Sequence, residues 1–272
     1  SANLNLYRTS WKNRVITTSR NVTSATETIG TSTLSQGDLV YTSSQTDEQL
    51  HQGVEVDFVV KPTTKLNFNA FASVGSWEYA GNSNQRRYDE SLSLLDENIK
   101  DVDGGKVGDA AQTTWGLGAK YEIFERFSVD ADWRNYDNLF SNVAATKDNL
   151  ELPSYDLVDF GISYKMLVGN KKQNSLSFRI NISNLFDEVY LSELTSAQNI
   201  ATEEEFVNHT GNGLINPNGS TSSSNHLQGT GINKYATYQE YLDKGTYNGL
   251  DARNQGYFGL GRTWSVSLKY SF

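Results

Sequence analysis

Five residues in one stretch combine aromatic rings with positive charge. They are Trp77, Tyr79, Arg86, Arg87 and Tyr88. Guanidinium groups beside aromatic faces suit anionic ligands, whereas aromatic faces without charge suit sugar rings. We therefore predict that this stretch contacts a ligand. The alternative is structural: the two aromatic residues would lie at a membrane interface, and the arginines would face solvent or lipopolysaccharide.

A second aromatic group lies near the end of the chain, in residues 237–244 (TYQEYLDK). Thr237 and Glu240 are spaced as a capping box and Gly245 can end a helix, so the segment predicts one or two helical turns. One face of this helix would carry Tyr238, Tyr241 and Leu242. That face either packs on the base of its own loop or contacts a ligand or a partner lipoprotein.

Residue types that carry out catalysis or bind metals occur without the spacing that such sites need. The three histidines, His51, His209 and His226, share no metal-ligand spacing, and the chain has no cysteine. The run Asp101 to Gly105 (DVDGG) lacks the third carboxylate and distal glutamate of a calcium loop. We predict no catalytic residue, no metal and no cofactor. A net charge of −9 also argues against a nucleic-acid partner.

The last sixteen residues alternate between two kinds of side chain. One face of residues 257–272 would carry Phe258, Leu260, Arg262, Trp264, Val266, Leu268, Tyr270 and Phe272. A period of two is typical of a β-strand, and strands of water-soluble domains usually stop after about five or six residues. A tilted strand crosses a bilayer in about 9–11 residues. The pattern favours a membrane-crossing strand; an edge strand of a soluble sandwich is the alternative.

The same alternation recurs in seven earlier segments, which are residues 2–11, 52–61, 65–77, 113–123, 127–135, 154–167 and 176–183. Short turns are predicted at 62–64, 124–126 and 169–174. Long polar connections are predicted at 19–48, 81–110, 138–153 and 191–256, the first as a loop or as strand extensions beyond the membrane. A short helix is expected at 91–99. In the first segment, either Leu4 and Leu6 or Tyr7, Thr9 and Trp11 could form the apolar face.

Connections that alternate between short and long are typical of outer-membrane barrels, which have short turns on one side and long loops on the other. The charged residues predicted on the inward faces are Asp57, Lys120, Asp130, Asp132, Arg134, Asp159, Lys165 and Arg179. These are too many charges for a dry core without dense pairing. We predict an all-β fold: a transmembrane antiparallel β-barrel segment of about eight strands with long extracellular loops.

A family resemblance agrees with this architecture. Residues 183–190 (SNLFDEVY) precede the last long connection, and the chain ends on alternating residues with Phe272. In this arrangement the chain resembles the carboxyl-terminal part of a TonB-dependent outer-membrane receptor. Residues 7–14 (YRTSWKNR) and 53–58 (GVEVDF) are similar to forms from the Bacteroidota. The SNLFDEVY segment is expected to anchor a strand end.

The resemblance covers residues 1–272 and implies the last eight strands of a 22-stranded barrel, with a plug domain that this chain lacks. It implies a receptor in the outer membrane of a Gram-negative cell, without enzymatic activity. Such a receptor imports a scarce nutrient, for example a siderophore or another metal chelate, with energy transmitted by TonB. The implied partners are the TonB complex through the plug, outer-membrane lipids and lipopolysaccharide, a surface lipoprotein, and the barrel-assembly machinery through the final strand. Phe272 would be the carboxyl-terminal signal for membrane insertion.

Other functions remain open at this point. A glycan importer that works with a surface lipoprotein fits the same architecture. A stand-alone eight-stranded barrel, acting as an anchor, adhesin or small protease, would need its first and last strands to pair. A passive porin subunit would need a loop that constricts the lumen.

Overall fold

One antiparallel sheet dominates the computed structural model, which describes residues 1–22, 24–141, 145–169, 173–194, 199–204, 206, 214–215, 221–222, 235 and 237–272. Eight strands form its wall in the order β1 (Ala2–Asn21), β4 (Leu39–Val60), β5 (Leu66–Tyr88), β7 (Thr113–Phe124), β8 (Phe127–Asp137), β11 (Tyr155–Val168), β12 (Asn174–Ser183) and β19 (Thr263–Ser271). The prediction of eight antiparallel strands is confirmed. Strands β1 and β19 lie at opposite edges of the sheet. Among the described residues, no helix is long and apolar enough to span a membrane.

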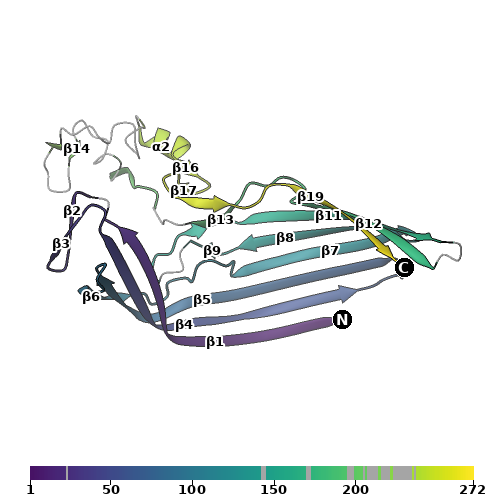
Figure 1. Cartoon of the computed structure of the whole chain (residues 1–272), viewed down its shortest axis with the longest axis horizontal. Helices are drawn as coiled ribbons and strands as arrows, with labels where there is room; N and C mark the ends of the chain where they lie inside the picture. Colours follow the sequence, from purple (N-terminus) through teal and green to yellow (C-terminus); the bar gives the residue numbers. More distant parts are fainter. Residues whose placement is uncertain are drawn as a thin grey trace.

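The connections differ sharply between the two ends of the sheet. Residues 61–65, 125–126 and 169–173 join strands at one end, which we call the turn end, and both chain termini lie there (Figure 1). The connections at the other end, the loop end, are residues 22–38, 89–112, 138–154 and 184–262. The predicted alternation of short and long connections is therefore confirmed.

Each wall strand has an apolar face and a polar face. Because directly paired residues of an antiparallel sheet share a face, the register joins apolar side chains into rows. One such row crosses seven strands through Val60, Phe68, Ala119, Ala131, Phe160, Ile182 and Trp264. Phe68 is 42% exposed and Trp264 is 75% exposed. A continuous exposed apolar surface of this kind is suited to lipid rather than water.

The register also settles which face of the first strand is apolar. Leu4 pairs with Val56 and Leu6 pairs with Val54. Leu4 and Leu6 therefore lie on the apolar face. Tyr7, opposite Gly53, lies on the polar face.

Strands β1, β4 and β5 continue well beyond the apolar rows, with 20, 22 and 23 residues respectively. They rise at the loop end (Figure 1) to a hairpin of β2 (Thr26–Ile29) and β3 (Ser32–Ser35). A small apolar cluster of Val22, Ile29, Leu34, Val40 and the partly buried Leu95 holds the hairpin to the strands. In the connection predicted at 19–48, residues 19–21 and 39–48 are thus strand extensions, and β2 and β3 form a separate hairpin.

The helix expected at 91–99 is wrong, because these residues contribute to β6 (Leu94–Asp101). Strand β7 pairs only with residues 66–74 of β5, which leaves the backbone of the upper part of β5 without a partner on that side. Strand β6 pairs with residues 82–88 and satisfies those groups. The pairing of β6 with the free edge of β5 overrides the helix preference of this segment. For the same reason the polar connection predicted to start at residue 81 begins only after Tyr88.

The final strand is shorter than predicted, because residues 259–262 interrupt it. Gly256–Phe258 form β18, which pairs with β13 (Leu191–Leu194), and the wall strand β19 starts at Thr263. The ring of Tyr190 occupies the space that a Cβ on Gly259 would need, with its Cζ 1.9 Å from that position. The Gly259 amide donates to the Tyr190 carbonyl over 2.8 Å. This close approach, which only glycine permits, bends the chain between β18 and β19.

Asn184 anchors the end of β12, as expected for the SNLFDEVY segment. Its side chain is buried, its Oδ1 accepts from the Glu188 amide (2.8 Å), and its Nδ2 donates to the carbonyls of Glu188 (2.9 Å) and Leu260 (3.2 Å). Asp187 Oδ1 accepts from the Arg262 amide over 2.7 Å. These bonds tie the start of the last long connection to its end.

The remaining elements lie in the long connections. They are β9 (Leu139–Phe140), β10 (Glu151–Leu152), β14 (Leu214–Ile215), β15 (Thr221–Ser222), α2 (Tyr238–Lys244), β16 (Thr246–Tyr247) and β17 (Leu250–Asp251). A buried apolar cluster of Leu139, Leu152, Leu191, Leu194 and Leu250 joins two of these connections. The described hydrophobic core thus lies mainly at the loop end and not behind the sheet.

Candidate functional site

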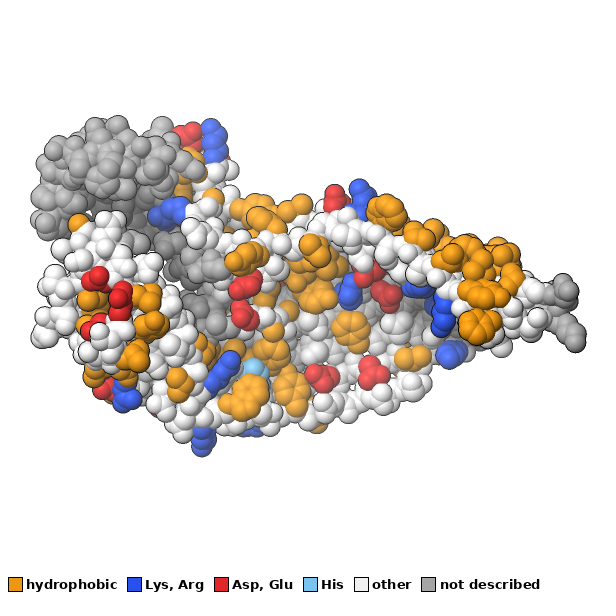
Figure 2. Space-filling view, viewed as in Figure 1, with side chains coloured by type: hydrophobic (Ala, Val, Ile, Leu, Met, Phe, Trp, Pro, Cys, Tyr) orange, Lys and Arg blue, Asp and Glu red, His pale blue; other side chains and the backbone are white. Residues whose placement is uncertain are grey.

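The polar face carries charges that pair with each other in the middle of the wall. Arg179 donates to both carboxylate oxygens of Asp130, each over 2.9 Å, and Arg134 pairs with Asp159. Acidic and basic side chains lie together across this part of the face (Figure 2). Asp57 accepts from Asn3 over 2.9 Å. These five charged residues lie on the polar face, as the strand alternation predicts.

Toward the loop end, four polar-face residues of three strands form an aromatic cluster: Tyr7, Trp11, His51 and Trp77. The His51 ring stacks on Trp77 with centroids 4.8 Å apart and planes 6° apart, and Trp11 meets His51 edge-on at 4.6 Å. Trp77 Nε1 donates to the Tyr7 hydroxyl over 2.8 Å. Trp11 is 46% exposed, so the cluster offers an open aromatic surface.

Two glycines make room for this cluster. A Cβ on Gly53 would lie 2.6 Å from the Tyr7 hydroxyl oxygen, and one on Gly75 would lie 2.8 Å from it. Neither position could hold a larger residue unless Tyr7 moved. The small residues on β4 and β5 therefore let the side chain from β1 lie across both strands.

The buried side-chain amide of Gln49 connects Arg14 to the aromatic cluster. Arg14 Nη1 donates to Gln49 Oε1 over 2.6 Å, and Gln49 Nε2 lies 2.7 Å from His51 Nε2. Because the Gln49 oxygen serves Arg14, its amide nitrogen donates to His51 Nε2, and the neutral imidazole carries its proton on Nδ1. Among the described residues, Arg14 forms no ion pair. The cluster thus combines aromatic faces with one uncompensated positive charge.

Of the residues predicted to bind a ligand, only Trp77 belongs to this cluster. Tyr79 is 1% exposed and packs in a cluster with Val102, Val107 and Ala145. Trp77 lies on the polar face. The alternative that Trp77 lies at a membrane interface is therefore wrong. The polar-face position follows from its direct pairing with His51.

The arginines of the same stretch are compensated by β6. Arg86 pairs with Glu97 and Arg87 pairs with Asp96, each across the two strands. Tyr88 lies at the end of β5 opposite Tyr41 and Leu94. The structure therefore does not bring these three residues to the aromatic cluster.

The second predicted group, around α2, lies in the last long connection. Thr237 caps the helix by accepting from the Glu240 amide over 3.1 Å, and Gly245 ends it, as predicted. Tyr238, Tyr241 and Leu242 pack together with Ala201, Phe206 and Tyr235. The packing half of that prediction is confirmed. His209 and His226 lie outside the described residues.

A buried carboxylate fixes this part of the connection. Asp251 is 1% exposed; it accepts from Arg253 Nε over 2.9 Å and from the Tyr241 hydroxyl. Burial raises the pKa of Asp251, but the hydrogen bonds from Arg253 and Tyr241 together lower the pKa by more, so it lies below its ordinary value. Asp251 is therefore ionised at neutral pH and stabilises the connection.

The DVDGG run pairs with a lysine. Asp101 Oδ2 accepts from Lys147 Nζ over 2.6 Å, and this hydrogen bond lowers the pKa of Asp101. No group of three or more His, Cys, Asp or Glu residues in the described part of the chain is placed to hold a metal ion.

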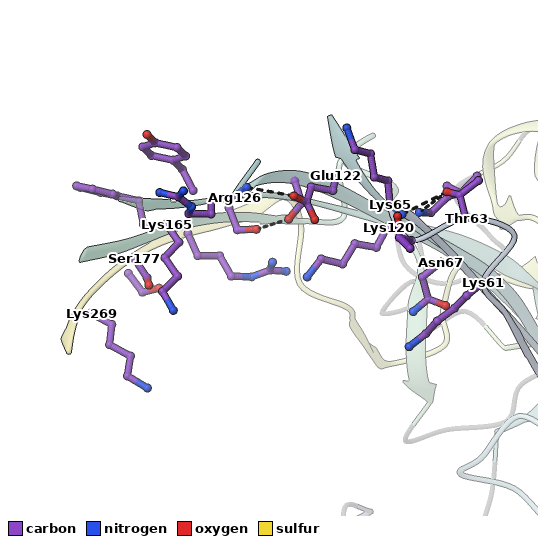
Figure 3. Close-up of a pocket in the computed structure, with 18 of the residues that line it drawn as sticks. Lys61, Thr63, Lys65, Asn67, Lys120, Glu122, Arg126, Lys165, Ser177 and Lys269 are labelled. Atoms are coloured by element: carbon purple, nitrogen blue, oxygen red, sulfur yellow. Dashed lines mark hydrogen bonds between the residues drawn. The ribbon is translucent and has the colours of Figure 1, made fainter. Parts of the chain in front are cut away.

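The turn end of the polar face has a hollow of about 1000 Å³, which we call the basic hollow. Its lining includes five lysines, two arginines and one glutamate: Lys61, Lys65, Lys120, Lys165, Lys269, Arg126, Arg179 and Glu122. Figure 3 shows the side chain of Lys61, in the connection after β4, and those of Lys120, Lys165 and Lys269, on β7, β11 and β19, reaching toward the same open space. Ser128, Ser163, Ser177 and Ser267 add hydroxyl groups to the lining.

The comparison with known families decides which class of protein has this architecture. The family described as TonB dependent receptor-like, beta-barrel matches residues 1–185. The chain belongs to this family. Among curated proteins, none matches the chain.

Family membership indicates that the sheet lies in the outer membrane. TonB-dependent receptors are transporters of the Gram-negative outer membrane, and their transport is coupled to TonB. The apolar face of this receptor therefore meets lipid and its polar face lines the lumen. By the general rule for outer-membrane barrels, the turn end faces the periplasm and the loop end faces outward.

Sequence reasoning missed three of the four cluster residues. Tyr7 and Trp11 share one alternation on β1, but the alternation alone does not decide which face of that strand is apolar, and the spacing of His51 bears only on metal binding. The position of His51 could have been found from the strand alternation. His51 is two residues from Gly53 and four from Glu55, and residues separated by an even number of positions share a face, so it lies on the polar face of β4. The basic hollow was also missed, because its lysines come from segments far apart in the sequence.

Proposed function

We propose that this receptor imports an anionic metal chelate with planar ring groups, such as a siderophore. The observation that carries the proposal is the aromatic cluster on the lumen side, with Trp11 46% exposed and Arg14 next to it without an ion-pair partner among the described residues. A planar group can stack on the indole, and the guanidinium can meet negative charge. Trp77, predicted as a ligand residue, belongs to this cluster and stacks on His51.

The remaining predicted contacts, Tyr79, Arg86, Arg87, Tyr88, Tyr238 and Tyr241, have weaker support as ligand residues. Tyr79 and Tyr241 are buried, and the two arginines are paired with carboxylates. A neutral glycan would use the aromatic rings but gain little from Arg14. The cation therefore favours the chelate over the glycan.

The test is uptake by cells that depend on the complete receptor. Trp11→Ala removes the exposed ring, and we expect the concentration for half-maximal uptake of a labelled ferric catecholate to rise about tenfold, since ring contacts contribute about 1 kcal/mol or more. Arg14→Gln should raise it by a similar factor for the anionic chelate only. Unchanged uptake in both variants, or a loss confined to neutral oligosaccharides, would reject the proposal.

The matched control is Trp264→Ala, an aromatic truncation on the lipid side. It should leave the half-maximal concentration unchanged. Gel mobility before and after heating checks that each variant folds and is present in equal amount.

The proposed partners follow from the setting of each element. TonB would act through a plug domain of the complete receptor, and lipopolysaccharide would surround the loop end. The barrel-assembly machinery would engage β19 and Phe272, which is 99% exposed. A surface lipoprotein would contact the last long connection. A stand-alone barrel would require β1 and β19 to pair, and these strands lie at opposite edges of the sheet.

A further inference from the structure

We propose that His51 is a specificity-determining residue of the aromatic cluster, and that its Nδ1–H group donates a hydrogen bond to an anionic oxygen of the imported solute. The inference rests on the proposed function, because it concerns a contact within the same site. It starts from the hydrogen bonds that fix the proton of His51 on one nitrogen of its ring.

The position of this proton follows from the chemistry of two neighbouring side chains. Arg14 can only donate, so Gln49 Oε1 is the acceptor of their 2.6 Å contact. The amide nitrogen of Gln49 therefore donates to His51 Nε2 over 2.7 Å, and Nε2 can accept only when it carries no proton. Gln49 is buried, so water does not compete for its amide. The imidazole of His51 is thus neutral and carries its proton on Nδ1.

The Nδ1–H donor of His51 is left free by the described part of the chain. Within that part, the contact with Gln49 is the only hydrogen bond of the His51 side chain. Nδ1 is not one of the buried side-chain atoms there that lack a partner, so it is open to solvent. The ring is held by its stacking on Trp77, with planes 6° apart. A donor with a fixed proton and a fixed ring is preorganised for a ligand.

The nearest carboxylates of β4 and β5 are not placed to accept from this donor. Glu48 is three residues from His51, and Glu78 is one residue from Trp77, so both lie on the opposite face of the sheet. Glu55 shares the polar face, but it is four residues away, about 13 Å along the strand. An acceptor for Nδ1–H would therefore be supplied by the solute.

The surroundings of the donor indicate which solutes it favours. A planar group that stacks on the exposed ring of Trp11 lies beside His51, because the centroids of the two rings are 4.6 Å apart. A hydrogen bond to an ionised oxygen is stronger than one to a neutral oxygen. The site would thus favour ring groups that carry anionic oxygens, such as catecholate or carboxylate oxygens, over rings that are only apolar.

A matched pair of substitutions separates the donor from the ring. Asparagine places its amide at the level of Nδ1 and glutamine places its amide at the level of Nε2, so His51→Asn keeps a donor for the solute and His51→Gln keeps a partner for Gln49. Both variants lose the stacked ring. In uptake of a labelled ferric catecholate by cells that carry the complete receptor, we expect the half-maximal concentration to be at least about fivefold higher in His51→Gln than in His51→Asn.

The outcomes distinguish this inference from the proposed function. A half-maximal concentration that is equal in the two variants, or higher in His51→Asn, would overturn the inference while uptake that still depends on Trp11 leaves the proposed function standing. Wild-type uptake that does not respond to Trp11→Ala would reject the proposed function, and this inference with it. Gel mobility before and after heating checks that both variants fold and are present in equal amount.

Nitrogen NMR of the complete receptor, labelled at histidine and held in lipid, tests the proton position without any solute. We expect the signals of His51, identified by their loss in His51→Asn, to show hydrogen on Nδ1 at neutral pH. Gln49→Met removes the donor to Nε2, and we expect both tautomers of His51 to be populated in this variant. A proton on Nε2 of His51 in the wild-type receptor would overturn the proposal, and so would a tautomer that does not respond to Gln49→Met.

Discussion

The two ends of the wall differ in whether their lysines and arginines pair with carboxylates. At the loop end, Arg86, Arg87 and Lys147 each face a carboxylate from a neighbouring segment. At the turn end, Lys120, Lys165 and Lys269 line one hollow and form no ion pair among the described residues, although Arg126 there pairs with Glu125. Charges that pair within the chain hold its own segments in place. Lysines without such pairs do not hold segments of the chain together in this way.

The largest expected effect is the loss of the most buried loop-end carboxylate. Asp251→Ala removes the acceptor of Arg253 and of the Tyr241 hydroxyl, which leaves the hydroxyl buried with one partner fewer. We expect the free energy of opening of the last connection to fall by about 2–3 kcal/mol. Amide hydrogen exchange of α2 measures this change.

Asp243→Ala is the matched control, because Asp243 is an exposed carboxylate of the same helix. It should leave exchange in α2 nearly unchanged. Equal protection of α2 amides from exchange in the two variants would contradict this prediction. It would mean that the hydrogen bonds of Asp251 with Arg253 and Tyr241 do not hold the last connection in place.

A smaller effect is expected from pH at the same carboxylate. The folded pKa of Asp251 lies below the value of about 3.9 for an unperturbed aspartate. Its contribution is therefore fully present above about pH 4 and is lost as the pH falls through the folded pKa. Exchange rates of α2 amides, corrected for intrinsic chemistry, should show constant protection from pH 7 to pH 5 and a decline below pH 4. In Asp251→Ala this decline should be absent.

The sequence predicts the wall well because its signals are local. A period of two marks each strand, and the short turns at 62–64 and 124–126 mark the end that faces the periplasm. The helix expected at 91–99 failed because the free edge of β5, created where β7 ends, is a long-range feature. The unbroken final strand failed because the approach of Tyr190 to Gly259 joins residues far apart in the chain.

The candidate site is less predictable than the wall for the same reason. Trp77 could be found from its neighbours in sequence, but its stacking on His51 requires the register of β4 against β5. Whether Arg86 carries a free charge depends on Glu97, which was expected in a helix. Strand parity gives the face of each residue, and only the register gives its partners.

The smallest expected effect is the change in wall stability when lysines at the turn end are neutralised. Combining Lys120→Gln, Lys165→Gln and Lys269→Gln removes no ion pair in the described wall and relieves mutual repulsion. We expect the stability of the wall to change by less than about 0.5 kcal/mol. The temperature at which the folded gel band disappears measures it.

Arg179→Gln tests the opposite case on the same face, because it breaks the pair with Asp130. The pair is partly exposed, with Arg179 at 39% and Asp130 at 16%, so we expect a loss of only about 0.5–1 kcal/mol. A triple lysine variant that is less stable than Arg179→Gln would show that the lysines hold the wall itself. If the order is as expected, these lysines do not hold the wall together, whereas the pair of Arg179 and Asp130 does.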